Sequence, residues 1–245
     1  MEDSREIAVA PAGAHRGAAL RRTAAIAVAC AGLVAAPAPA GAQAGGQVGL
    51  RAGAQSAAQG QARQDSLDAR VMRYLGGRGW HDMNVPAADG RVLRDIIVER
   101  RFTRALEVGT STGHSAIWMA LGLSRTGGRL VTIEIDEGRH GEAVRNFREA
   151  GVSEYVDARL ADAHQLVPSL PGPFDFAFLD ADKDWNVRYL RAILPKLAPG
   201  GCVAVHNISR RYRRGWDADY VAEVERTPGL ETTFVGTSIA LSCRR

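Results

Sequence analysis

The chain has 245 residues, of which 46% are hydrophobic, so it can fill the core of one sizeable domain. Its net charge of +4 is scattered along the sequence and only 6% of its residues are aromatic, which does not indicate a basic, base-stacking surface for nucleic acid. Three cysteines without a C-x-x-C pair exclude a zinc knuckle and a disulfide-dense scaffold.

Residues 1–64 are rich in Ala, Gly and Gln and have almost no large apolar side chains, so we expect them to stay disordered. This segment contains the elements of a secretory signal: the basic pair Arg21-Arg22, an apolar run over residues 23–36, and small residues ending at Ala42 or Ala44. The run is too short to span a bilayer. We therefore expect an exported, periplasmic protein if the signal is functional, and a cytoplasmic protein otherwise.

Residues 65–245 form the predicted folded domain, which opens with two helices. Apolar residues at helical spacing predict the first helix from Ser66 to Gly77, where a glycine pair ends it. The second helix is predicted to begin after Asn84-Val-Pro86 and to end near Arg101. We expect both helices to cover the rim of the sheet that follows.

The rest of the chain alternates between strand and helix patterns. Strands are predicted at residues 106–108, 130–135, 156–160, 174–179, 202–206, 231–235 and 238–243, and helices at 115–123, 138–150, 163–170, 184–197 and 217–226. This alternation predicts an α/β fold with a doubly wound, mostly parallel sheet, closed by an antiparallel hairpin across Gly236.

A glycine turn after the first strand narrows the choice of cofactor. The segment from Ala105 to Ser115 has Gly109 and Gly113 in a G-x-x-x-G arrangement, whereas a dinucleotide fingerprint has G-x-G-x-x-G around a pyrophosphate. A turn of this kind suits a ligand without a phosphate, and S-adenosylmethionine (SAM) is the leading candidate. The second strand carries Glu134 near its end, where an acid can accept two hydrogen bonds from a ribose diol.

From about residue 70 to residue 245, the sequence resembles the cation-dependent small-molecule O-methyltransferases, the class that includes catechol and caffeoyl-CoA O-methyltransferases. The matching motifs are Leu106-Glu-Val-Gly-Thr-Ser-Thr-Gly-His-Ser115, Thr132-Ile-Glu-Ile135, Phe178-Leu-Asp-Ala-Asp-Lys183, Leu197-Ala-Pro-Gly-Gly201 and His206-Asn207. The resemblance implies the Rossmann-like fold of SAM methyltransferases and methyl transfer from SAM to a hydroxyl group, expected to be phenolic, of a small molecule.

The resemblance also assigns the cofactor site. The glycine turn would hold the methionine part of SAM, Glu134 the ribose, and the residues after the third strand the adenine. The implied cofactor-binding residues are Glu107, Gly109, Gly113, Ser115, Glu134, Asp162 and Ala163.

The implied catalytic residues are Asp180, Lys183 and His206, and the implied metal ligands are Asp180, His206 and Asn207. A divalent cation (Mg, Mn or Zn) favours the oxyanion of a phenol, and a neighbouring lysine can act as general base or hold that oxyanion. The family usually has Asp-Asn where this chain has His206-Asn207. Because imidazole favours Zn or Mn over Mg, either the metal preference has shifted or His206 serves as a base or hydrogen-bond partner instead.

Two other functions remain open. One is an exported SAM-binding protein or degenerate methyltransferase without turnover, which has lost its metal with the change to His206. Export itself conflicts with SAM as cofactor, because SAM is a cytoplasmic metabolite. An NAD-dependent oxidoreductase is opposed by the missing G-x-G-x-x-G.

In the topology that the resemblance implies, Cys202 and Cys243 lie on neighbouring antiparallel strands, so we expect a disulfide only if their Cα atoms are within about 7 Å. The family is often dimeric, and we expect a homodimer.

Overall fold

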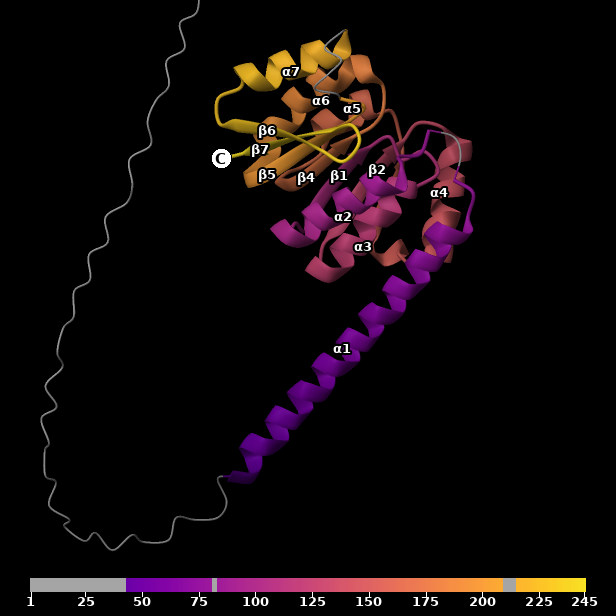
Figure 1. Ribbon diagram of the computed structural model, residues 1–245, viewed down its shortest axis with the longest axis vertical. Coiled ribbons are helices and arrows are strands. Elements are labelled where there is room, and N and C mark those ends of the chain that lie inside the picture. The colour runs from indigo at the N-terminus through magenta and orange to yellow at the C-terminus, as the bar shows by residue number, and fades with distance from the viewer. Residues whose placement is uncertain (1–42, 81–82, 209–214) are drawn as a thin grey trace, which may run out of the picture. The chain divides into compact units, whose positions relative to one another are not determined.

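The computed structural model describes residues 43–80, 83–208 and 215–245; the basic pair and apolar run of the expected signal lie outside them. The contacts divide the chain into Met1–Gln47 and Val48–Arg245. A seven-stranded sheet in the order β3-β2-β1-β4-β5-β7-β6 forms the centre of the second unit (Figure 1). The strands are β1 Arg104–Val108, β2 Arg129–Glu134, β3 Val156–Leu160, β4 Phe174–Leu179, β5 Leu197–His206, β6 Leu230–Val235 and β7 Ile239–Arg244.

The first five strands run parallel and only β7 runs antiparallel to its neighbours, β5 and β6. Both the α/β class and the antiparallel closing hairpin are therefore confirmed. The chain winds from β1 outward to β3, then returns past β1 to β4, so the winding direction reverses between β1 and β4. In open α/β sheets this reversal leaves a crevice at the carboxyl ends of the strands.

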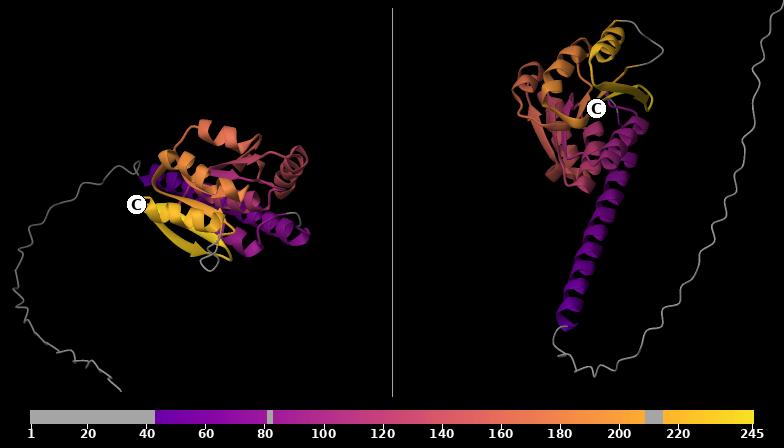
Figure 2. Two further views of the ribbon diagram at one scale, coloured as in Figure 1. Left: turned by 90° about the horizontal axis from the view of Figure 1, so that it is seen from above. Right: turned by 90° about the vertical axis from the view of Figure 1, so that its left-hand side faces the viewer.

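Helices cover both faces of the sheet (Figures 1 and 2). One core cluster joins the sheet to the C-terminal part of α1 and to α2, α3 and α4, and the other joins the opposite face to α5, α6 and α7. Trp118, with 1% of its surface exposed, is the largest side chain of the first cluster. The helices are α1 Gln43–Gly77, α2 Ala87–Arg100, α3 His114–Thr126, α4 Glu137–Ala150, α5 Ala163–Ser169, α6 Asn186–Ile193 and α7 Trp216–Arg226.

Helix α1 begins at Gln43, well before the expected start at Ser66, so residues 43–64 are helical rather than disordered. Alanine and glutamine are good helix formers, which explains a helix without a core. From residue 53 to 63 every described side chain is exposed, whereas Val71 and Leu75 are buried in the domain. In the described part of the chain, no helix is long and apolar enough to cross a membrane.

Strand pairing brings Cys202 of β5 opposite Cys243 of β7, with 4.0 Å between their Cα atoms, and the two form a disulfide. The bond joins residues 41 positions apart, and closing a loop of that size in the unfolded chain is worth about 2–4 kcal/mol.

We expect reduction of the Cys202–Cys243 disulfide, or Cys243→Ser, to lower the free energy of unfolding by about that amount. Urea unfolding with and without reductant measures the effect. The Cys243→Ser variant serves as the control, because reductant should not change its stability further.

Candidate active site

A cavity of about 790 Å³ lies at the carboxyl ends of the parallel strands. Nine of the residues predicted from the sequence line it: Gly109, Ser115, Glu134, Asp162, Ala163, Asp180, Lys183, His206 and Asn207. The structure adds lining residues that belong to none of the predicted motifs, namely Met83, Asn84, Arg139 and Tyr189. Segments far apart in the chain thus meet around one space, as the reversal between β1 and β4 requires.

The glycine turn forms one wall of the cavity. Gly109 has φ +96° and its N–H donates to the carbonyl of Ile133 at 3.0 Å, which ties the turn to β2. Gly113 has φ +94° and precedes the first residue of α3. It does not line the cavity; instead it packs closely against Phe147, where an added Cβ would lie 2.6 Å from the ring. We infer that Gly113 shapes the turn and does not contact the ligand.

Glu107 also lies outside the cavity wall, although the sequence assigned it to the cofactor. Its side chain is fully buried beneath the turn, where Ser115 Oγ and Thr132 Oγ1 each hydrogen-bond to its carboxyl group at 2.5 Å. Burial raises its pKa to about 8, although the two hydroxyls lower it. Glu107 therefore supports Ser115, which does line the cavity, from below.

This buried carboxyl group predicts a pH-dependent stability. Between pH 4.5, the ordinary pKa, and pH 8, the unfolded chain loses the Glu107 proton while the folded chain keeps it, so stability falls as the pH rises. Each unit of difference is worth about 1.4 kcal/mol, and we expect a loss of more than about 2 kcal/mol between pH 5 and 8. The Glu107→Gln substitution should remove this loss of stability between pH 5 and 8. Urea unfolding at several pH values tests this, with exposed Glu99→Gln as control; parallel wild-type and Glu107→Gln curves would contradict it.

Glu134 and Asp162 are both held by backbone N–H groups. Glu134 Oε2 accepts from Ser111 at 2.7 Å, and its Oε1 accepts from Ile135 and Asp136 at 3.0 Å. Asp162 caps α5 by accepting from the N–H of His164 at 2.9 Å. Each carboxylate is thereby fixed in the cavity wall with lone pairs remaining, as a contact to ribose or adenine requires.

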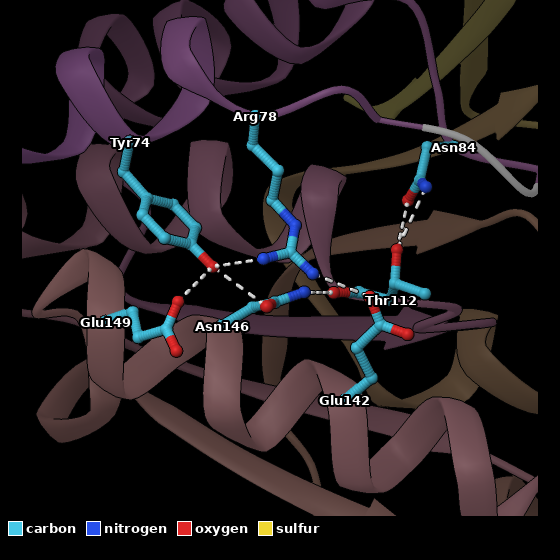
Figure 3. A network of polar contacts seen from close by, with 7 residues as sticks. All are labelled: Tyr74, Arg78, Asn84, Thr112, Glu142, Asn146 and Glu149. Atoms are coloured by element: carbon cyan, nitrogen blue, oxygen red, sulfur yellow. Dashed lines mark hydrogen bonds and ion pairs between the residues drawn. The ribbon is translucent and has the colours of Figure 1, made fainter.

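A network of polar side chains fixes the outer side of the glycine turn (Figure 3). Asn146 of α4 donates to the carbonyl of Thr112 at 2.7 Å and accepts from Tyr74 of α1 at 2.8 Å. The hydroxyl of Thr112 hydrogen-bonds to Asn84, which lines the cavity. Arg78 donates to Glu142 and to the hydroxyl of Tyr74, and that hydroxyl also contacts Glu149. It holds α1 and the segment before α2 against the turn, a role that spacing in the sequence could not indicate.

The loop after β4 carries Asp180 and Lys183, and Lys183 Nζ lies 2.5 Å from Asp180 Oδ1. Asp182, between them, accepts from Tyr189 at 3.0 Å and contacts His164 at 2.9 Å. Trp185 does not line the cavity and stacks on His164, with 3.5 Å between the ring centroids.

His206 ends β5 and lies between two carboxylates. Its Nδ1 is 3.2 Å from Asp180 Oδ2, and its Nε2 is 3.1 Å from Asp89 Oδ2 on α2. Burial lowers the pKa of His206, but the hydrogen bonds and charge of Asp180, together with Asp89, outweigh it and hold the pKa above its ordinary value. No sequence signal pointed to Asp89, because an acid in the first turn of a helix is ordinarily explained by the helix dipole.

Comparisons with known proteins agree with this geometry. A family model described as a methyltransferase domain matches residues 106–208. A catechol O-methyltransferase of Mycobacterium tuberculosis is 36% identical over 165 residues, covering 62% of this chain and 74% of that protein. The chain belongs to the SAM-dependent O-methyltransferases.

Solved structures extend the likeness to the fold and cofactor. A cofactor-bound protein from MTB matches with a TM-score of 0.62 and 28% identity, covering 74% of this chain and 90% of that one. The O-methyltransferase TomG from Streptomyces achromogenes, in complex with SAM, has a TM-score of 0.59 and 25% identity, covering 73% and 88%. This O-methyltransferase is therefore an enzyme that takes its methyl group from SAM and transfers it to a small molecule.

Proposed function

We propose that this O-methyltransferase methylates a phenolic hydroxyl of a small molecule at the cluster formed by Asp180, Lys183 and His206. The observation that carries the proposal is the meeting of these three side chains in the wall of the cavity at the carboxyl ends of the strands, with Lys183 and His206 both directed at Asp180. A phenol needs such a cluster because its pKa is near 10, like that of tyrosine. The catechol O-methyltransferase names of the relatives favour this class of acceptor.

Methyl transfer is an in-line displacement at the sulfonium, so the enzyme must present a deprotonated oxygen to the methyl carbon. We assign the proton to His206: the neutral ring takes it at Nδ1, and the imidazolium so formed lies between the carboxylates of Asp180 and Asp89. The Lys183 ammonium holds the oxyanion. The family resemblance implies that Lys183 is the base, but its contact with Asp180 favours the role of oxyanion holder.

The predicted cation site does not fit these contacts. Asp180 already faces two nitrogen donors, Lys183 and His206, and both nitrogens of His206 face carboxylates. Asn207 lines the same cavity but adds only an amide. Within the described ranges, no three His, Cys, Asp or Glu side chains are arranged to hold a metal ion. We derive no step through a cation, and the positive charge near the acceptor oxygen comes from Lys183 and His206.

The test combines binding and turnover on the full chain. We expect SAM to bind in calorimetric titration and NAD not to bind. We also expect a methyl ether to form from catechol but not from cyclohexanol, at a rate that EDTA leaves unchanged. SAM binding without methylation across a panel of phenols would overturn the phenolic assignment, and a rate that returns only with added Mg, Mn or Zn would overturn the assignment of charge to Lys183 and His206.

We further propose that the protein is exported. The Cys202–Cys243 disulfide supports this, since disulfides persist mainly in oxidising compartments. Fractionation of expressing cells and mass spectrometry of the mature N-terminus test it. Recovery of the intact chain from the cytoplasm alone would contradict export.

A further inference from the structure

A second cavity, of about 410 Å³, is lined by residues from the C-terminal end of α1, the segment before α2, and the first turns of α2 and α3. Of the described residues, only Met83 and Asn84 line both this cavity and the larger one. Asp180, Lys183 and His206, to which the methyl transfer is assigned above, do not line it. The second cavity is therefore a separate space beside the cofactor site, and the methyl transfer gives it no role.

Two tryptophans form aromatic walls of the second cavity, and both are held in place. Trp80 donates its Nε1–H to the carbonyl of Leu75 at 3.0 Å, and its ring lies 4.6 Å from the ring of His114, centroid to centroid. Trp118 has 1% of its surface exposed, and its Nε1–H donates to His114 Nε2 at 3.3 Å. All three rings line the cavity. Rigid aromatic walls suit a flat apolar ligand, because they lose little conformational freedom when it binds.

Arg91 gives the second cavity a positive charge without a counterpart. It is the only charged side chain among the described lining residues, since burial lowers the pKa of His114 to about 4 and leaves that ring neutral. Arg91 is exposed, its guanidinium lies 5.6 Å from the centre of the Trp118 ring, and no carboxylate in the described part of the chain pairs with it. A guanidinium group binds a carboxylate in bidentate geometry. The charge therefore favours an anionic ligand.

Two methionines leave apolar surface exposed at the second cavity. Met72 is 39% exposed and Met83 is 70% exposed, and both line the cavity. The backbone of Met83 has φ +53°, a left-handed conformation that residues other than glycine rarely adopt. Exposed apolar side chains and strained backbone are both typical of ligand-binding sites. The flexible thioether side chain of methionine also adapts readily to the shape of a ligand.

We propose that the second cavity binds a small aromatic carboxylate, with its ring system against Trp80 and Met83 and its carboxylate on Arg91. The volume lies within the range of about 300–1,000 Å³ that is usual for small-molecule pockets. The apolar and aromatic walls disfavour a bare inorganic anion, and the unpaired arginine disfavours a cation. Binding needs neither SAM nor a methyl acceptor, so the proposal does not depend on the phenolic function proposed above.

The test uses 2-naphthoate as the probe, titrated calorimetrically into the full chain in the presence of saturating SAM. We expect one molecule to bind per chain, and 2-naphthamide, which has the same rings without the charge, to bind at least about fivefold more weakly. The factor is modest because Arg91 is exposed and an exposed ion pair is screened by water.

Tryptophan signals locate the bound probe. The chain has four tryptophans, of which Trp80 and Trp118 line the second cavity while Trp185 and Trp216 do not. In proton–nitrogen spectra of tryptophan-labelled protein, we expect 2-naphthoate to shift the indole N–H signals of the first two and to leave the others in place. Substitution of each tryptophan by phenylalanine assigns its signal.

Arg91→Gln should weaken 2-naphthoate binding about fivefold and leave 2-naphthamide binding unchanged. Arg94→Gln is the matched control on the same helix. The guanidinium of Arg94 also lies near the Trp118 ring, at 5.5 Å, but it pairs with Asp95 and does not line the cavity. Arg94→Gln should therefore leave both affinities unchanged.

Several results would overturn the proposal: no binding of 2-naphthoate at millimolar concentration, its displacement by SAM, or shifts confined to Trp185 and Trp216. Equal affinities for 2-naphthoate and 2-naphthamide in the wild type would overturn the carboxylate assignment without any variant. Equal losses in the Arg91 and Arg94 variants would do the same. If the wild type methylates no phenol, the proposed function fails, while these titrations still decide whether the second cavity is a binding site.

Discussion

Replacing Lys183 by methionine is expected to lower kcat by about 10²–10³-fold, because the acceptor oxyanion loses the ammonium that holds it. Methionine keeps most of the side chain's length and removes only the charge, so SAM should bind with nearly unchanged affinity. The neighbouring Asp180 loses its closest partner, at 2.5 Å, and keeps only His206 to offset its negative charge near the acceptor. Initial rates with SAM and catechol, together with calorimetric titration of SAM, separate the loss of turnover from any loss of binding.

The chain supplies its own control for this experiment. It has 31 basic residues other than histidine, and only two of them, Lys183 and Lys196, are lysines. Lys196 Nζ donates to the carbonyls of Val167 and Pro168 and does not line the cavity. Lys196→Met should therefore cost some stability and leave kcat unchanged. Equal losses in the two variants would mean that Lys183 acts only through the fold.

The fold could be predicted from the sequence because its signals are local. Each parallel strand is a short apolar run next to an amphipathic helix, and the predicted β3 and β4 coincide with Val156–Leu160 and Phe174–Leu179. The predicted start of helix α1 is wrong, because composition argues against a core there while the same Ala and Gln residues favour a helix. Core formation and helix propensity are separate quantities, and a segment can have the second without the first.

The site could be predicted where a residue follows a strand, since the carboxyl ends of parallel strands meet at one edge. Glu134 was predicted from its place at the end of a strand, whereas the family resemblance implied Asp180 and His206, and all three line the cavity at that edge. The rule could not tell that Glu107, one residue before the end of β1, lies beneath the turn, because strand residues alternate in direction. Nor could it find Asp89, whose partner Thr237 is 148 positions away and is brought there only by the closing hairpin.

Gly109→Ala is expected to weaken SAM binding at least about 100-fold, because the turn and the loop after β4 leave no room for a methyl group. A Cβ at Gly109 would lie 2.7 Å from the carbonyl oxygen of Asp180 and 2.9 Å from the nitrogen of Ala181. These are backbone atoms directly after a strand paired to β1, so they cannot move aside as the tip of a side chain could. Either the glycine turn or the loop that carries Asp180 must shift, and both line the cavity.

Backbone strain has to be separated from this collision, because Gly109 also has φ +96°. Gly127 provides the separation: its φ is +73°, but no atom lies within 4 Å of the position that a Cβ would take there. Gly127→Ala should therefore cost about 1 kcal/mol of stability through φ alone and leave SAM affinity unchanged. If both variants bind SAM like the wild type, the approach of Asp180 to the turn is not needed for the cofactor. If only Gly109→Ala loses SAM, that close approach is what joins the cofactor site to the catalytic loop.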